Sequence, residues 1–302
     1  MSLSLKSTAL FGDDDFMKIC TSTTAWTHFF SMEETLQKLA EAGFDAIDLS
    51  LYDLEKTTIL DQPDYLEKAA EIRKMAAANG LEILQAHAPF GHHWEDEDGT
   101  ARVIRAIEVC GVANIPNIVV HPCFLSDRRY DEKQQEYFDL NVNYYNRLRP
   151  YAEKAGVKIA IENMFVWDGQ RNQIAPSIFS TAEEMLDMLT VLDGPFTVCL
   201  DLGHANLNGT QTAAEMIRKL GGEHLGCLHI HDNDGVSDLH TLPLMQKIDF
   251  EPIFQSLHDI HYGGYFTYEA DNFFRRLPAS CYPAAAQLMV VLAKDFIDHY
   301  QL

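Results

Sequence analysis

The segment LHIHDND, residues 228–234, ends a short apolar run with two histidines followed by an aspartate. Alternate side chains of a β-strand point to the same side, so His229 and His231 share a face if this run is a strand. Imidazole and carboxylate groups can hold metal ions and transfer protons. The segment therefore has two interpretations, an ordinary polar turn or one edge of a reactive site, and the other strand ends decide between them.

Metal-binding residue types also stand at the ends of five other apolar runs. A single histidine or aspartate at such a position is typical of a hydrogen-bonded group or a helix cap. Six apolar runs that all end in this way instead favour one shared site. In chain order the residues are His87, His121, Glu162, Asp201 with His204, His229 with His231, and Glu269.

Short apolar or β-branched runs alternate with longer amphipathic stretches, which is the pattern of repeated strand–helix units. Ser or Asp opens several of the helical stretches, Glu follows in the first turn, and Gly often ends them. Clear examples are residues 31–43, 64–80 and 180–192. The expected strands are residues 18–22, 46–51, 82–88, 117–122, 158–163, 196–201, 226–231 and 265–270.

Eight strand–helix units, with strands that are apolar on both faces, predict an α/β fold, a single (β/α)₈ TIM barrel. The alternative is an open doubly wound sheet, which normally carries a glycine-rich phosphate-binding turn after its first strand. Residues 20–29, at and after the end of the first expected strand, contain no glycine. No linker-like stretch divides the chain, so we expect an N-terminal extension over residues 1–17 and one barrel domain over residues 18–302.

In such barrels the carboxyl ends of the strands form one face, where catalytic groups gather. Glu162, Asp201 and Glu269 would then converge, and three partly desolvated carboxylates repel one another unless they bind a cation. With His229 they provide three oxygen ligands and one nitrogen ligand, which suits a divalent ion: Mn²⁺, Mg²⁺, Co²⁺ or Zn²⁺. His231 has two open roles, support of a neighbouring ligand or a structural one.

The chain of 302 residues carries a formal charge of −22 at pH 7, which opposes binding to a nucleic acid backbone. Its six cysteines include no C-x-x-C pair, as expected for reduced thiols in the cytoplasm. No segment has the apolar length of a signal peptide or of a membrane span. We therefore expect a cytoplasmic protein that acts on a small molecule and binds neither nucleic acid nor membrane, with homo-oligomer formation left open.

Several of these motifs together resemble the xylose isomerase-like barrels, a superfamily of sugar phosphate isomerases and epimerases that includes tagatose and psicose 3-epimerases, inosose-processing enzymes and endonuclease IV. The resemblance extends over most of the chain. It implies that Glu162, Asp201, His229 and Glu269 bind one divalent metal ion, and that the two glutamates also move protons. The motifs are HAPF at His87, HP at His121, EN at Glu162, DLGH at Asp201, HIHD at His229, DLH at Asp238 and IDF at Ile248.

Endonuclease IV, which holds three zinc ions, has a longer set of ligands that this sequence also matches. The likeness makes five further residues candidates for additional metal or substrate binding. The D-x-H motif also recurs in relatives regarded as sugar isomerases, so it does not by itself indicate a nuclease. Acidic or balanced loops after the expected strands weigh against an abasic-site nuclease, because binding DNA requires neutralising many phosphates. The five residues are His87, His121, His204, Asp238 and His240.

Aromatic residues that follow the strand ends are expected to line a sugar pocket, and these are Trp26, Phe90, Trp94, Phe124, Phe165 and Trp167. Such faces favour an unphosphorylated ketose or polyol, because a phosphate needs a cationic anchor. The predicted reaction is proton transfer next to a carbonyl, with the metal polarising the carbonyl and a glutamate acting on the adjacent carbon. Epimerisation, aldose–ketose isomerisation and dehydration of a keto-inositol all begin this way and remain open, as does a sugar-binding barrel without turnover.

Overall fold

The computed structural model describes residues 17–302 with the exception of 53–57, 91–95, 126–128 and 170. Within these residues all the expected strands are present and form one eight-stranded sheet. Every neighbouring pair in this sheet is parallel. The strands are β1 (Ile19–Ser22), β2 (Ala46–Ser50), β3 (Glu82–His87), β4 (Asn117–Val120), β5 (Lys158–Glu162), β8 (Phe196–Asp201), β9 (Leu225–His229) and β10 (Phe266–Tyr268).

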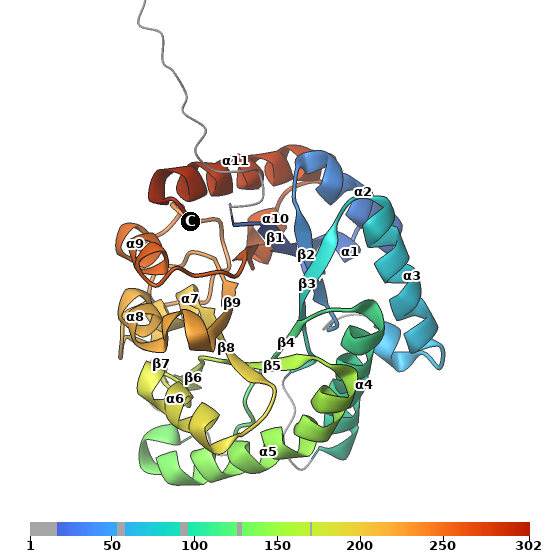
Figure 1. Cartoon of the computed structure of the whole chain (residues 1–302). Helices are drawn as coiled ribbons and strands as arrows, with labels where there is room; N and C mark the ends of the chain where they lie inside the picture. Colours follow the sequence, from blue (N-terminus) through green and yellow to red (C-terminus); the bar gives the residue numbers. More distant parts are fainter. Residues whose placement is uncertain (1–16, 53–57, 91–95, 126–128, 170) are drawn as a thin grey trace, which may run out of the picture.

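The sheet has the order β10-β1-β2-β3-β4-β5-β8-β9, so apart from the β10–β1 pair its neighbouring strands stand in chain order, with β6 and β7 outside the sheet. Its two edges meet just beyond the end of β9, where Ile230 forms a parallel bridge with Tyr268. The Ile230 amide donates to the Thr267 carbonyl at 2.9 Å, and the Glu269 amide donates to the Ile230 carbonyl at 3.2 Å. The sheet is therefore curved into a nearly closed barrel, which confirms the (β/α)₈ prediction and excludes an open doubly wound sheet (Figure 1).

Helices surround the barrel and cover the outer faces of its strands (Figure 1). A large apolar cluster lies between strands and helices, and two smaller clusters lie on the alternate strand positions that face the barrel interior. None of the described helices is both long and apolar enough to cross a membrane. The helices are α1 (Thr24–Thr27), α2 (Met32–Ala42), α3 (Tyr65–Ala78), α4 (Glu97–Ala113), α5 (Gln134–Ala155), α6 (Ala182–Val191), α7 (Leu202–Asn208), α8 (Ala213–His224), α9 (Glu251–Asp259), α10 (Asp271–Phe274) and α11 (Tyr282–Tyr300).

The predicted helices follow local capping chemistry. The Ser31 hydroxyl accepts the Glu34 amide at 3.2 Å, and the Glu34 carboxylate accepts the Ser31 amide at 2.9 Å, so α2 begins with a capping box. Helix α2 ends at Gly43, whose φ of 99° lies in the left-handed region that suits glycine. Helix α6 begins after Thr181 rather than after Ser180, because the Thr181 hydroxyl accepts the Glu184 amide.

A small antiparallel sheet of β6 (Phe165–Asp168) and β7 (Gln173–Pro176) follows β5. The sequence pattern does not predict it, since strands of four residues are too short for a clear alternation of apolar and polar positions. This hairpin brings Phe165 and Trp167 to the same cavity as the histidines at the ends of the barrel strands. It therefore forms one wall of the barrel mouth.

The predicted N-terminal extension lies almost entirely in residues 1–16, outside the described part of the chain. Met17 is buried, and its amide donates to the Leu302 carbonyl at 3.3 Å. The folded barrel therefore includes this residue, one position earlier than the expected boundary.

Candidate metal centre

Four side chains from neighbouring strands converge at the carboxyl end of the barrel. Glu162, Asp201 and His229 are the last residues of β5, β8 and β9, and Glu269 follows β10 directly. The Nδ1 atom of His229 lies 2.8 Å from Glu162 Oε1, 3.8 Å from Asp201 Oδ2 and 3.2 Å from Glu269 Oε2. One potential ligand atom from each residue lies within 4.8 Å of those of the other three. The structure thus brings together the four residues that the sequence suggests for one ion.

The chemistry of this group fits a divalent cation. Glu162, Asp201 and His229 are fully buried, and Glu269 is nearly so. Three carboxylates so close together in a buried site carry more negative charge than one imidazole can balance. Together the four residues offer three oxygen ligands and one nitrogen ligand, which is a ligand set suited to Mn²⁺, Mg²⁺, Co²⁺ or Zn²⁺.

The two glutamates differ in their affinity for protons. Burial favours the neutral form of Glu162, but the imidazoles of His121 and His229 outweigh it and hold the pKa of its carboxyl well below the usual range. Burial raises the pKa of Glu269 to about 7, against the opposing effect of His229 and His240. Two carboxyl groups with pKa values pushed apart are the usual arrangement of a general base and a general acid in one site.

Two polar residues inside the barrel orient His229, and sequence reasoning missed both. The Gln85 amide donates to Asp48 Oδ2 at 2.7 Å, and the same nitrogen lies 2.9 Å from Nε2 of His229. Asp48 Oδ2 itself lies 3.5 Å from this Nε2. These contacts on one side of the ring leave Nδ1 facing the three carboxylates, as a metal ligand requires. The available signal was a buried Asp and a buried Gln within the otherwise apolar strands β2 and β3.

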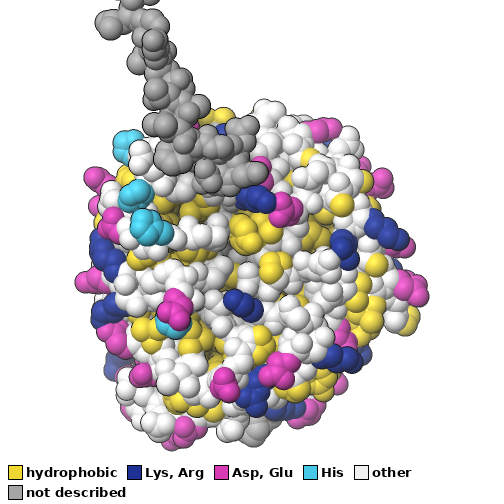
Figure 2. Space-filling view, viewed as in Figure 1, with side chains coloured by type: hydrophobic (Ala, Val, Ile, Leu, Met, Phe, Trp, Pro, Cys, Tyr) yellow, Lys and Arg dark blue, Asp and Glu magenta, His cyan; other side chains and the backbone are white. Residues whose placement is uncertain are grey.

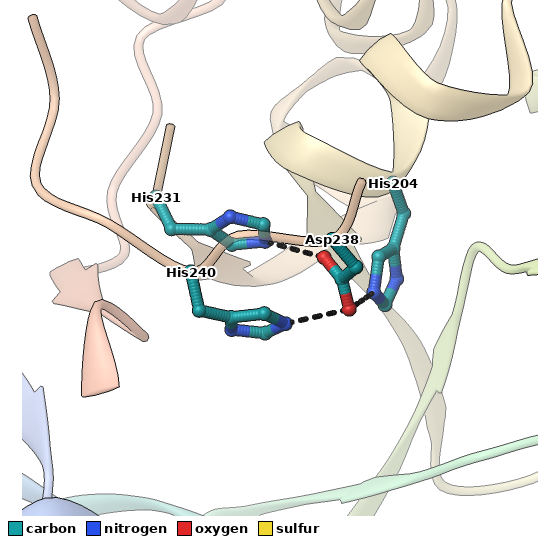
Figure 3. Close-up of side chains that lie close together, drawn as sticks. All are labelled: His204, His231, Asp238 and His240. Carbon is teal, nitrogen blue, oxygen red and sulfur yellow. Dashed lines mark hydrogen bonds and ion pairs between the residues drawn. The ribbon is translucent and has the colours of Figure 1, made fainter. Parts of the chain in front are cut away.

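Two further groups of metal-binding side chains flank the central four. On one side, Nε2 of His121 lies 2.8 Å and Nε2 of His87 lies 3.7 Å from Glu162 Oε2. On the other side, Nε2 of His231 lies 3.0 Å from Asp201 Oδ1. The second flanking group consists of His204, His231, Asp238 and His240 (Figure 3). All the residues that the sequence suggested for additional metal or substrate binding therefore lie in one continuous cluster.

A cavity of about 530 Å³ opens onto this cluster. Four of the aromatic residues expected from the sequence line it, namely Phe90, Phe124, Phe165 and Trp167. Trp94 lies outside the described residues. Glu269 and four histidines also line it, so a sugar-sized molecule in the cavity would meet the central group at Glu269; the histidines are His87, His121, His204 and His240.

The prediction for Trp26 is wrong. Its side chain is 1% exposed and is not among the residues that line the cavity. The indole ring instead packs edge-on against Phe274 at 5.4 Å and against Tyr282 at 5.2 Å. Helix α1 is only one turn long and turns this side chain inward, where burial of a large apolar surface is favourable.

A second cavity, of about 590 Å³, lies beside the same hairpin and shares Val166 and Trp167 with the first. It contains none of the residues of the metal-binding cluster. Its Arg171 is paired with Asp131 and Asp168, each at 3.3 Å. The first cavity is therefore the one that adjoins the metal-binding cluster.

Residues 36–285 match the family model of the xylose isomerase-like TIM barrel. The chain belongs to this family. Among curated relatives, an uncharacterized protein of Methanocaldococcus jannaschii, MJ1311, is 28% identical over 252 residues, which cover 80% of this chain and 80% of the relative. An uncharacterized protein of Sinorhizobium fredii, y4fM, is 24% identical over 281 residues, covering 82% and 86% of the two chains.

Several solved structures share the fold. A D-tagatose 3-epimerase-like protein has a TM-score of 0.74 at 24% identity, covering 94% of this chain and 98% of its own. D-psicose 3-epimerase has a TM-score of 0.72 at 18% identity, covering 93% and 99%. The IOLI protein, solved with a bound zinc atom, has a TM-score of 0.71 at 20% identity, covering 94% and 99%.

Proposed function

We propose that this protein is a divalent-metal-dependent sugar isomerase or epimerase that moves a proton on the carbon next to a carbonyl. The observation that carries the proposal is the central group itself, where two glutamates, an aspartate and a histidine converge and Glu269 opens onto a cavity. The structural neighbours support it, since those described above include a tagatose 3-epimerase-like protein and a psicose 3-epimerase.

The metal would be held by Glu162, Asp201, His229 and Glu269. A bound divalent ion would polarise the carbonyl and an adjacent hydroxyl of the substrate, which makes the neighbouring C–H group more acidic. Asp48 and Gln85 keep the His229 ring in the orientation that binding requires. The IOLI neighbour binds zinc, which is compatible with this ligand set.

The protein's own proton transfers would involve the two glutamates. Glu162 is ionised at neutral pH and can therefore accept the proton from carbon. Glu269 would lose its own proton when an ion binds, so it would act as a second carboxylate that exchanges a proton with the substrate from the other side of the site. Transfer on opposite sides gives an epimer, whereas return of the proton to the adjacent carbon gives an aldose–ketose isomer. Dehydration of a keto-inositol would begin with the same first step.

The cavity favours a substrate without a phosphate group. None of the described residues that line it is Lys or Arg, whereas five are Phe, Tyr or Trp and three are Asp or Glu. Aromatic faces pack against the C–H faces of sugars, and carboxylates accept hydrogen bonds from hydroxyl groups. A free ketose or polyol suits this lining better than a sugar phosphate does.

A solvent-exchange experiment tests the proposal. The protein is loaded with each divalent ion and incubated in deuterated water with a panel of ketoses, aldoses and inososes, and deuterium at carbon is measured by mass spectrometry. A productive sugar should gain deuterium next to its carbonyl, and chelation should abolish the exchange.

Glu162→Gln and Glu269→Gln each keep a metal-binding oxygen but remove the base, so each should lower the exchange rate about 10² to 10⁴-fold. Glu136→Gln is a matched control, because Glu136 is exposed on the surface of α5, where it pairs with Lys133. The proposal fails if no carbonyl sugar exchanges with any ion, or if both glutamine variants of the central group exchange at the wild-type rate.

One observation favours a second candidate, a phosphodiesterase of the endonuclease IV type. The three contiguous groups of metal-binding residues have room for more than one ion. Against it stands the formal charge of −22, which opposes a polyanionic substrate. We therefore place it second to the sugar isomerase.

A further inference from the structure

Two cavities meet at the hairpin of β6 and β7, where Val166 and Trp167 line both of them. Phe165 lines only the first cavity, at the metal-binding cluster, and Asp168 lines only the second. These two residues are three positions apart, which is about 10 Å along a strand. The cavities have volumes of about 530 and 590 Å³, so each has room for a sugar ring. A ligand of two linked rings would therefore span both.

Trp167 provides an aromatic surface at the junction of the two cavities. Its side chain is 49% exposed, so much of the indole is open to a ligand. A molecule that covers this ring would bury a large apolar area, which is favourable. The C–H faces of sugar rings suit such a surface, while their hydroxyl groups remain directed toward polar side chains around it.

The second cavity is lined by groups that can bind hydroxyls. Its Arg171 guanidinium lies 3.3 Å from both Asp131 and Asp168, and the Arg171 amide donates to Asp168 Oδ1 at 3.0 Å. A guanidinium fixed by two carboxylates holds its remaining donors, and their free lone pairs, in set directions. Hydroxyl groups both donate and accept, so they fit this mixed lining. The other polar side chains there are Gln134, Ser180, Thr181, Glu184 and Thr210.

The charges of the second cavity weigh against a phosphate group. The described residues that line it include two arginines, and both are already in ion pairs, Arg171 with Asp131 and Asp168 and Arg129 with Glu132. A phosphate would have to displace a carboxylate from Arg171 and would then lie beside the displaced negative charge. An uncharged group rich in hydroxyls meets no such cost.

We propose that the second cavity binds a second sugar unit, so that the substrate is a disaccharide or another glycoside. The unit with the carbonyl would occupy the first cavity, and the glycosidic bond would cross Val166 and Trp167. This inference rests on the proposed function, because it extends the substrate of the same site. It adds no chemical step, since the glycosidic bond stays intact while a proton moves on the unit that carries the carbonyl.

Ketose-containing disaccharides test the proposal. Isomaltulose, maltulose and lactulose each join an aldose to a fructose unit whose carbonyl is free, and they sample different linkages. Deuterium exchange by the metal-loaded full chain is compared with that of D-fructose, D-tagatose and D-psicose. At least one disaccharide should exceed the best single ketose in kcat/KM by about 10-fold or more. The gain should come mainly from a lower KM, because contacts far from the reacting carbon act equally before and during the reaction.

Ala175→Phe narrows the second cavity alone. Ala175 lines this cavity and not the first, and it pairs with Val166 in the hairpin. A phenyl ring there should lower the preference for the disaccharide over the single ketose by about 10-fold or more. Arg171→Gln should lower it in the same direction through lost hydrogen bonds, without adding bulk. Ala284→Phe is the matched control, since Ala284 is exposed on α11 and should leave the preference unchanged.

Calorimetric binding separates this inference from the proposed function, because it requires no turnover. A disaccharide that binds more tightly than every single ketose, and is weakened by Ala175→Phe, supports the second sugar site even if no sugar exchanges; only the isomerase would then fail. Exchange of a single ketose as efficient as that of every disaccharide overturns the second sugar site alone. So does a preference for a disaccharide that neither Ala175→Phe nor Arg171→Gln lowers.

Discussion

At the scale of single residues, the two glutamates of the central group differ in protonation when no metal is bound. Glu162 is stabilised as a carboxylate by two imidazoles, while burial keeps Glu269 partly protonated near neutral pH. An incoming divalent ion must displace that proton, because a metal ligand has to be deprotonated. Metal binding should therefore strengthen with pH through the range in which Glu269 titrates.

Glu269 also makes the stability of the metal-free protein depend on pH. Its pKa is raised from an ordinary 4.5 to about 7, so the folded state holds a proton that the unfolded state loses. The stabilisation is complete below about pH 4.5 and is lost as the pH rises through 7. Relative to Glu269→Gln, the free energy of unfolding of the wild type should fall by about 2 to 3 kcal/mol across this window.

Urea denaturation in the presence of a chelator, at several pH values between 4.5 and 8, measures this difference. If the free energies of unfolding of the wild type and Glu269→Gln differ by the same amount at every pH, Glu269 does not hold an extra proton in the folded state.

At the scale of elements, the site depends on close contact between the beginning of α7 and the segment that follows β9. Gly203, in the first turn of α7, has no side chain, and the ring of His231 occupies the space where one would lie. The Asp201 carboxylate caps the same helix by accepting the His204 amide at 2.6 Å. Within one turn, the DLGH motif thus provides Asp201, which is both a candidate metal ligand and the helix cap, and Gly203, which makes room for the His231 ring.

Gly203→Ala tests this contact. The added methyl group would lie 1.9 Å from His231 Cε1, and the fully buried ring has no solvent-filled space to enter. We expect a loss of roughly 1 to 3 kcal/mol in the free energy of unfolding, as for other overpacked cores, with weaker zinc binding. Gly263→Ala is the control, since a Cβ there meets nothing within 4 Å. Equal stability of the two variants would show that the ring moves away freely.

At the scale of the whole molecule, the acidic balance restricts the partners. Figure 2 shows acidic and basic side chains interspersed on one face of the barrel, without a continuous basic patch among the described residues of that face. With a formal charge of −22, the molecule repels polyanions at long range. A small neutral substrate is not affected by this field.

The charge leads to a direct prediction about DNA. At about 0.15 M salt, with zinc or manganese present, the protein should not nick a duplex that contains an abasic site. The reason is that an acidic protein offers too few basic side chains to neutralise the phosphates of the DNA. Gel electrophoresis of a labelled duplex measures the nicking. Efficient nicking that a chelator stops would replace the sugar isomerase with the phosphodiesterase, whereas traces at very low salt would leave the assignment unchanged.

The barrel and the types of metal-binding residue could be predicted from the sequence. Eight apolar runs separated by helical stretches allow few folds, and parallel strands bring their carboxyl ends to one face, so Glu162, Asp201, His229 and Glu269 could be expected to meet. These inferences rest on local periodicity and on strand direction, both of which can be read from consecutive residues.

The orientation of the side chains could not be predicted in the same way, because it depends on contacts made in the folded barrel. His229 and His231 are two residues apart, yet His229 faces the carboxylates of the central group while His231 packs on His240 and Gly203. Trp26 turned into the core rather than the cavity. In each case the deciding contacts come from residues distant in the sequence, and no local pattern contains the packing that selects one side-chain orientation over another.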